Sequence, residues 1–390
     1  MRIHFHYLFA TALALLFTIV CLPATAINAQ AQQTRVPVPT QTPPPQKPVS
    51  VDSEPEAEVV RVETDLVNTL FTAVDKDRHF VTSLRAEDVR IFENDVPQTV
   101  SLFQRETDRP LSLAILIDTS ESQRGVMAQE KLAARAFVES VIRPGIDHAT
   151  VLSFTGIPKL EQPLTSDPVR LRKGIDQIRV ELSAENQRLL AAGEDPLPIE
   201  QDPTGYTSIW DALWLTIQEH LIKTPDNTRR AIILLSDGDD TSSRKGKQEV
   251  IDLAVKSDVV IYAIGIRDAD FPEGKLDAGA LRKVSDKTGG RAFIPAGPAD
   301  LTQAFSQIDQ ELRSQYLIAY SPTNKNRDGT YRRLRIEIIN PALRQQKLQL
   351  LYRQGYYAKK CPGAARHRRT GHKPRAEKTE LKTLLKIQFR

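Results

Sequence analysis

The sequence contains almost no cysteine, which excludes a fold that depends on disulfide bonds. Only Cys21 and Cys361 are present in 390 residues. Cys21 lies in an N-terminal apolar run, so a chain processed after that run keeps one cysteine and cannot form an internal disulfide. The fold must therefore rest on its core, and a hydrophobic content of 40% with a charged content of 26% fits a globular protein.

Long apolar segments are also scarce, and the one that stands out is residues 8–22. It follows Arg2 and precedes two A-x-A cleavage candidates, at 24–26 and 29–31. We therefore expect residues 1–31 to be a signal peptide and the protein to be secreted, periplasmic or part of the cell envelope. An uncleaved membrane anchor is the alternative, because the run is near the lower limit of ~17 to 25 residues for a span.

A net positive charge is lacking in the body of the chain and is confined to its C-terminal end. Residues 359–390 hold eleven Lys or Arg against two Glu, so this tail carries +9 and the rest of the chain −5, for a total of +4. We expect the tail to be a disordered, solvated extension. Contact with an anionic, phosphate-rich surface is the alternative, and nucleic acid is not the partner that we favour.

Two kinds of hydrophobic pattern divide the rest of the chain. Residues 32–57 are Pro- and Gln-rich, which predicts a disordered linker. Residues 58–106 and 314–358 alternate apolar and polar side chains, the period of half-buried strands. We expect these flanks to form one small β-sandwich-type domain, because the ends of an inserted domain lie close together. The alternative is that the second flank completes the edge of the central sheet.

Residues 110–313 alternate buried strands with amphipathic helices, which predicts an α/β fold with a doubly wound, mostly parallel sheet. In the first helix, Leu132, Phe137 and Val141 are expected to face the core. The polar, proline-containing stretch 181–203 is expected to be a loop insertion. Strands are expected at 112–118, 149–154, 231–236, 259–266 and 291–294, and helices at 127–142, 169–180, 207–221, 248–256, 276–288 and 301–312.

Hard oxygen donors follow two of these strands. Asp118, Ser120 and Ser122 stand at alternate positions just past an apolar strand, and Asp237 follows another. Thr207 lies at the start of a helix. Because ligands of open α/β sheets bind at the carboxyl ends of strands, these five residues are expected to surround one ion. For the first three, a polar turn that caps the next helix is the alternative reading.

The residue types favour Mg²⁺ or the similar Mn²⁺ over other cations. No His or Cys lies in these loops, which disfavours Zn²⁺. Ca²⁺ favours about seven oxygen ligands that include several carboxylates. Three hydroxyls and two carboxylates would leave a dication weakly compensated, with an open position that a carboxylate from outside could fill.

The motifs Asp118-Thr119-Ser120-Glu121-Ser122, Gly205-Tyr206-Thr207 and Ser236-Asp237-Gly238 resemble those of the von Willebrand factor type A domain. The resemblance covers roughly residues 110–312. It implies a metal-ion-dependent adhesion site with Asp118, Ser120, Ser122, Thr207 and Asp237 as the metal ligands. The flanks, 66–103 and 316–338, resemble those of the bacterial VWFA-related secreted proteins typical of acidobacteria.

Four other residues are expected at the rim of this site: Glu121, Tyr206, Asp239 and Asp240. Glu121 either tunes the field at the ion or is simply exposed, and the two aspartates are expected to form a solvated acidic rim. Trp210 and Trp214 are expected in the core, and the alternative is that one of them lines the metal face.

An enzyme is not expected. There is no Gly-x-Ser-x-Gly nucleophile motif, and His148 and His220, the only histidines within 110–313, show no partner acid. We therefore expect a secreted module that captures an Asp or Glu side chain of a protein partner through the metal, with no small-molecule substrate. The alternative is a structural scaffold of the cell envelope that binds nothing through a metal.

Overall fold

The computed structural model describes residues 66–106, 108–182, 184–194, 206–268 and 275–360. The expected signal peptide, the linker, Cys361 and the rest of the basic tail lie outside these residues. The described residues all belong to one compact unit, Val62–Arg390. None of the helices in these ranges has both the length and the apolar character that crossing a membrane requires.

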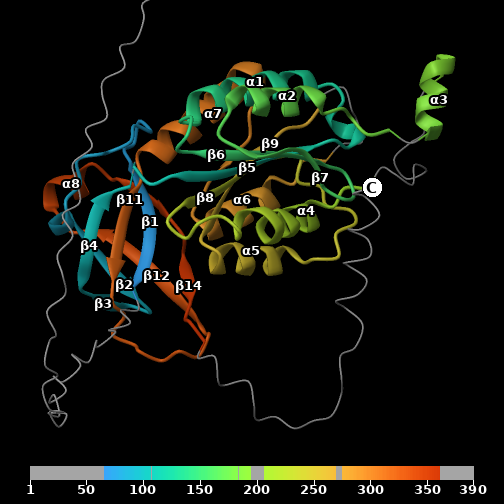
Figure 1. Ribbon diagram of the computed structural model, residues 1–390. Helices are drawn as coiled ribbons and strands as arrows, with labels where there is room; N and C mark the ends of the chain where they lie inside the picture. The colour runs from blue at the N-terminus through green and yellow to red at the C-terminus, as the bar shows by residue number, and fades with distance from the viewer. Residues whose placement is uncertain (1–65, 107, 183, 195–205, 269–274, 361–390) are drawn as a thin grey trace, which may run out of the picture. The chain divides into compact units, whose positions relative to one another are not determined.

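A six-stranded sheet forms the middle layer of the α/β domain, with the strand order β10-β9-β8-β5-β6-β7 (Figure 1). Neighbouring strands are parallel, except that β7 pairs with β6 in the antiparallel direction. The predicted mostly parallel sheet is thus confirmed. Its strands are β5 (Leu111–Asp118), β6 (His148–Phe154), β7 (Lys159–Thr165), β8 (Arg229–Ser236), β9 (Val259–Gly265) and β10 (Ala292–Phe293).

Helices cover both faces of this sheet. Helices α1, α2 and α7 lie on one face and α4, α5 and α6 on the other (Figure 1). The expected loop insertion contains a helix, α3, and the helix after Thr207 ends in a π-helical turn, η4. The bounds are η2 (Glu121–Gln123), α1 (Met127–Val141), α2 (Pro168–Gln177), α3 (Ala184–Ala192), α4 (Ile209–Thr216), η4 (Ile217–Leu221), α5 (Lys247–Lys256), α6 (Ala278–Thr288) and α7 (Pro298–Arg313).

The hydrophobic core is split by the sheet into two layers. All eight residues of β5 are buried, and their side chains alternate between the two layers. In α1, Phe137 and Val141 are buried as expected, but Leu132 is 62% exposed. The expectation for Leu132 was wrong because the buried stripe of α1 runs from Met127 through Ala134 to Val138. Leu132 is not one of the residues on this stripe, so its side chain faces solvent.

Strands from both flanks of the α/β domain share two four-stranded sheets, in the orders β13-β1-β11-β4 and β14-β12-β2-β3. The β1–β11 and β2–β12 pairs each join the N-terminal flank to the C-terminal one, so the expected β-sandwich-type domain is present and the alternative, a completed central sheet, is wrong. The bounds are β1 (Val67–Val74), η1 (Ala86–Asp88), β2 (Val89–Glu93), β3 (Val96–Gln98), β4 (Val100–Arg105), β11 (Tyr316–Tyr320), β12 (Tyr331–Ile338), α8 (Pro341–Gln345), β13 (Gln349–Tyr352) and β14 (Gly355–Tyr357).

Candidate metal centre

The first part of the site lies at the carboxyl end of β5. Asp118 is the last residue of this strand, and its carboxylate turns the following loop by accepting a hydrogen bond from the Ser120 backbone N–H at 2.9 Å. Thr119 anchors the same loop to β6, because its N–H donates to the Phe154 carbonyl at 2.8 Å. The loop therefore presents Ser120 and Ser122 side by side, with their hydroxyl oxygens 3.1 Å apart.

The end of β8 lies next to this loop, because β5 and β8 are parallel neighbours. Ser122 donates a hydrogen bond to Asp237 Oδ2 at 2.7 Å. Ser236 donates to Asp118 Oδ2, also at 2.7 Å. Gly238 then turns the chain with φ 81°, a left-handed conformation that glycine adopts without strain. Four of the five expected ligands are thus joined in one hydrogen-bonded series, Asp118 to Ser120, Ser120 to Ser122 and Ser122 to Asp237.

Thr207, the fifth expected ligand, is held by its backbone. Its N–H donates to Thr241 Oγ1 at 2.8 Å, and its carbonyl accepts from the N–H groups of Thr241 and Ser242. These partners belong to the loop that begins at Asp237. Ser208 fixes the other side, because its N–H donates to the Thr155 carbonyl just after β6. The Thr207 backbone is therefore held between the loops that follow β6 and β8, and no hydrogen bond among the described residues joins its hydroxyl to the other four expected ligands.

The two carboxylates of the site are buried without a positive partner. Asp118 is 0% exposed and Asp237 3%. Burial, followed by the charge of Asp237, raises the pKa of Asp118 to about 7. Burial likewise raises the pKa of Asp237. In the described chain, the hydrogen-bond donors to the two are backbone N–H groups, hydroxyls and the Gln123 amide, none of them cationic. Clustered hard oxygens with uncompensated negative charge fit a divalent cation.

Sequence reasoning missed a third buried carboxyl beside the site, that of Glu130. The side chain is 0% exposed, and neither of its oxygens has a hydrogen-bond partner among the described residues. Burial, followed by the charges of Asp118 and Asp237, raises its pKa well above the usual range. A signal for it was present, since Glu130 occupies a position of the buried stripe of α1, between Met127 and Ala134.

The rim residues differ from the expectations in part. Glu121 is only 5% exposed and accepts a hydrogen bond from Arg124 at 2.6 Å, so the reading of a simply exposed side chain was wrong. Tyr206 is 47% exposed. Asp240 is half-buried, and its carboxylate accepts hydrogen bonds from the Ile209 N–H, at the start of α4, and from the Ser243 hydroxyl. Asp239 is half-buried.

A second group of potential ligand atoms lies in the β domain, in the turn after β1. Asp75, Asp77 and His79 each offer one ligand atom, and these three atoms lie within 4.8 Å of one another. The alternating spacing of these residues was a signal that sequence reasoning did not use. Asp75 Oδ1 accepts the backbone N–H groups of Asp77 and His79, so its carboxylate already serves to close the turn.

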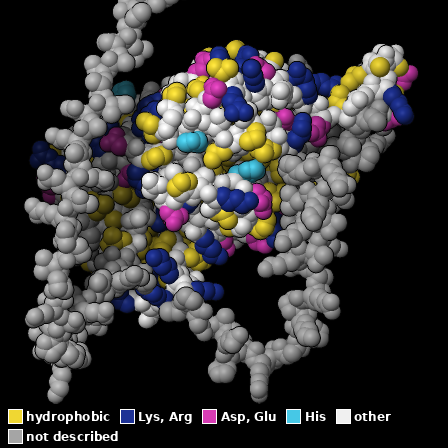
Figure 2. Space-filling model, in the orientation of Figure 1, with side chains coloured by type: hydrophobic (Ala, Val, Ile, Leu, Met, Phe, Trp, Pro, Cys, Tyr) yellow, Lys and Arg dark blue, Asp and Glu magenta, His cyan; other side chains and the backbone are white. Residues whose placement is uncertain are grey.

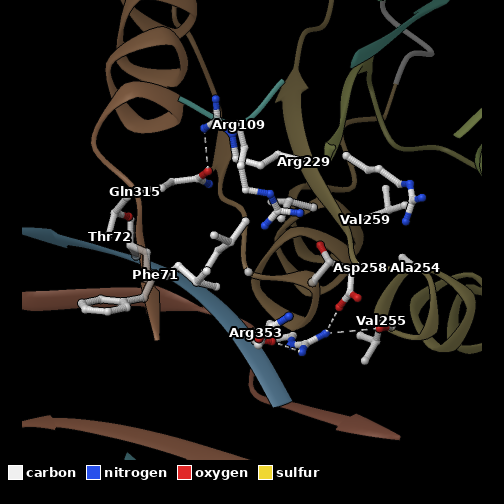
Figure 3. Close-up of a pocket in the computed structure, with 18 of the residues that line it drawn as sticks. Phe71, Thr72, Arg109, Arg229, Ala254, Val255, Asp258, Val259, Gln315 and Arg353 are labelled. Atoms are coloured by element: carbon white, nitrogen blue, oxygen red, sulfur yellow. Dashed lines mark hydrogen bonds and ion pairs between the residues drawn. The ribbon is translucent and has the colours of Figure 1, made fainter. Parts of the chain in front are cut away.

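A pocket of about 110 Å³ lies at the opposite end of the central sheet, where the β domain meets the α/β domain. Arg229, which lines this pocket, pairs in register with Leu111 at the start of β5. Leu111 lies about 23 Å along the strand from Asp118, so the pocket is far from the candidate metal centre. Figure 3 shows Arg353 reaching from the β domain toward Asp258 and Val255. The Arg353 guanidinium also donates a hydrogen bond to the Asn68 carbonyl. Arg229 donates to the Leu312 carbonyl and to Gln315. These arginines hold the two domains together.

Two family models match the chain, and both describe the von Willebrand factor type A domain. One matches residues 113–239 and the other residues 195–307. The first match includes all five expected ligands. A comparison with curated proteins finds no match.

Solved structures with a similar fold include proximal thread matrix protein 1 from the mussel byssus, at 16% identity, with 57% of this chain and 51% of that chain covered and a TM-score of 0.43. Another structure of that protein, with a zinc-occupied MIDAS motif, gives the same identity and TM-score. The chain thus spans about half the length of these two. A von Willebrand factor type A protein from Catenulispora acidiphila is 13% identical, with 70% and 74% covered and a TM-score of 0.41. With its matching family models, its sheet and its helical layers, the chain belongs to the family of proteins that contain a von Willebrand factor type A domain.

Proposed function

We propose that the α/β domain binds a divalent cation, Mg²⁺ or Mn²⁺, at the end of β5 and uses it to capture an acidic side chain of a protein partner. The observation that carries the proposal is that two buried carboxylates, Asp118 and Asp237, are joined by hydrogen bonds through the Ser120 N–H and the hydroxyls of Ser120 and Ser122. The residues that would hold the ion are Asp118, Ser120, Ser122, Thr207 and Asp237. When bound, the cation would supply an electrophilic position for a carboxylate from the partner.

The chain's own residues prepare that position in two ways. Ser236 and the Ser120 N–H fix the Asp118 carboxylate, so little freedom is lost when a ligand binds. Ser122 and Gln123 fix Asp237 in the same way. Tyr206, exposed beside Thr207, offers an aromatic surface at the rim that a protein partner can bury.

Binding rather than catalysis is favoured by the positions of the histidines. His148 pairs in register with Ser112, near the start of β5, so it lies about 20 Å along the strand direction from Asp118. His220 lies in η4, beyond the end of α4. Neither is placed to act as a general base at the site. We also propose that the protein works outside the cytoplasm, on the strength of its N-terminal sequence.

Capture of partners on the immobilised protein tests this function. Proteins of the source cell envelope should be retained in Mg²⁺ and released by EDTA, and Thr207→Ala should lose the same proteins while keeping the wild-type circular dichroism spectrum. Retention that survives both EDTA and Thr207→Ala would instead favour the structural scaffold, in which the domain acts as a rigid spacer.

A further inference from the structure

A groove of about 510 Å³ runs beside the candidate metal centre, between the start of α1 and the segment that follows α2. Both of its walls are attached to the loop that carries Ser120 and Ser122. The Glu181 N–H donates to the Thr119 carbonyl at 2.9 Å, which fixes the wall after α2. Arg124, on the other wall, follows Ser122 by two residues and is hydrogen-bonded to Glu121. The groove therefore lies next to the loop that carries Ser120 and Ser122.

The groove is basic. Its lining holds four cations and one acid, which are Arg124, Lys131, Arg135, Arg179 and Asp176. The single acid pairs with Arg135 at 3.0 Å. Lys and Arg side chains are visible over the helical layer that contains α1 and α2 in Figure 2. Arg124 is likewise paired, with Glu121 at 2.6 Å, so Lys131 and Arg179 are the two cations of the lining that no carboxylate of the described residues pairs with.

Two of these cations are held by neutral groups alone. Lys131 Nζ donates to the carbonyls of Asp176 and Ile178 at 2.8 and 2.9 Å, and Arg179 donates to the same two carbonyls. In the described chain no carboxylate forms an ion pair with either. Partial burial, followed by the charge of Arg179, lowers the pKa of Lys131. An acidic ligand would relieve this concentration of positive charge.

The floor of the groove is apolar. Exposed Ala128 and half-buried Val180 supply its accessible surface, above the buried Met127 and Ile178. A peptide that alternates acidic and small apolar side chains matches such a floor with a basic rim. A nucleic acid matches it less well, because it carries a phosphate at every nucleotide and no small apolar side chains between its charges.

We propose that this groove binds an extended acidic segment of the protein partner, one of whose carboxylates is taken by the metal. The inference rests on the proposed function and deepens it, since it assigns the chemistry of the partner around its metal-binding acid. Arg179 and Lys131 contact the additional acidic side chains, and the apolar floor takes the residues between them. Specificity then comes from the groove, while the metal position accepts any suitably placed carboxylate.

A fluorescein-labelled octapeptide of alternating Glu and Ala, followed by fluorescence anisotropy in Mg²⁺ and in EDTA, tests the inference. We expect Arg179→Glu and Lys131→Glu each to raise the dissociation constant in Mg²⁺ about tenfold, equivalent to about 1.4 kcal/mol. Lys283→Glu makes the same charge change at an exposed site on α6, on the other face of the sheet. This control variant should change the dissociation constant less than about twofold. Thermal denaturation of each variant checks that it is folded.

The outcomes separate this inference from the proposed function. If the peptide binds only in Mg²⁺ but Arg179→Glu and Lys131→Glu bind it as the wild type does, the groove assignment is overturned and the metal site stands. If EDTA leaves binding unchanged while the two variants weaken it, the groove stands and the metal-dependent function fails. If a single-stranded oligonucleotide of equal charge binds as tightly and loses affinity equally in the variants, the groove takes any polyanion and the peptide assignment fails.

Discussion

Ser122 Oγ donates a hydrogen bond to Asp237 Oδ2 at 2.7 Å, although the two residues lie 115 positions apart in the chain. This contact joins the loop after β5 to the loop after β8, and with it the two carboxylates of the site. Since Asp118 and Asp237 are buried and negatively charged groups repel each other, the metal-free site stores unfavourable energy that a cation would relieve.

Asp237→Asn should therefore stabilise the metal-free protein and abolish its response to metal. Asparagine keeps an oxygen that can accept from Ser122 but removes the repulsion, so in EDTA we expect the free energy of unfolding to rise by about 1 kcal/mol or more. The wild type, at Mg²⁺ a hundredfold above its dissociation constant, should gain about 2.7 kcal/mol, and the variant nothing. Thermal denaturation in EDTA and in Mg²⁺ measures both effects.

Asp226→Asn is the control, because it makes the same change at an exposed side chain near the opposite end of the central sheet. It should behave as the wild type in both buffers. If Asp237→Asn and the wild type are equally stable in EDTA and respond equally to Mg²⁺, Asp237 neither repels Asp118 nor holds an ion.

Gly289→Ala should destabilise the junction between the two domains. Gly289 ends α6 with φ 93°, and an added Cβ would lie 2.7 Å from the backbone nitrogen of Arg353, in the β domain. Gly145 has a similar φ of 78°, but a Cβ there would meet nothing within 4 Å. Gly145→Ala should lower the free energy of unfolding by about 1 kcal/mol through backbone strain alone.

For Gly289→Ala we expect a further loss of about 1 to 3 kcal/mol from the steric overlap. Urea denaturation of the two variants and the wild type gives the comparison. Equal losses for the two variants would mean that the β domain does not pack against α6 in solution as it does in the structure.

Glu311→Gln should change how stability depends on pH. Glu311 is buried on α7, where it accepts hydrogen bonds from Tyr262 and Arg291, and burial raises its pKa from 4.5 to about 7. Between these values the folded state keeps a proton that the unfolded state has released. The contribution of this carboxyl to stability is therefore complete below pH 4.5 and falls by about 1.4 kcal/mol for each pH unit up to 7.

Glutamine does not titrate, so the variant should lose this fall. Chemical denaturation of both proteins between pH 4 and pH 8 would show their free energies of unfolding diverging in favour of the variant as the pH rises from 4.5 to 7. Parallel profiles would show that the pKa of Glu311 is not raised in the folded protein.

Much of the fold could be predicted from the sequence, because periodicity reports burial on regular elements. The buried run that became β5 is an example. The strand β7 gave no such signal, since Lys159–Thr165 is polar and lies at the sheet edge. Leu132 was misplaced because an apolar residue near helical spacing need not lie on the buried stripe. Helix α3 was missed because two prolines further along made the whole stretch look like a loop.

Three short motifs predicted the five ligands of the candidate site, four of which the structure joins by hydrogen bonds, whereas the groups that support them could not be predicted. Ser236 reads as an ordinary strand residue until the structure shows that it donates to Asp118. Glu130 is charged, and nothing but its place on a helical stripe indicates burial. The hydrogen bond from the Ile209 N–H to Asp240 could not be predicted either, because the two residues lie 31 positions apart and leave no local sequence pattern.

Isothermal titration calorimetry of Mg²⁺ tests the central claim most directly, on the wild type, Asp118→Ala and Asp77→Ala. Asp77 belongs to the exposed group after β1, so its variant removes an acidic residue from the other possible cation position. We expect saturable binding by the wild type and Asp77→Ala, and none by Asp118→Ala. Equal heats for the wild type and Asp118→Ala would contradict the assignment of a metal to the end of β5.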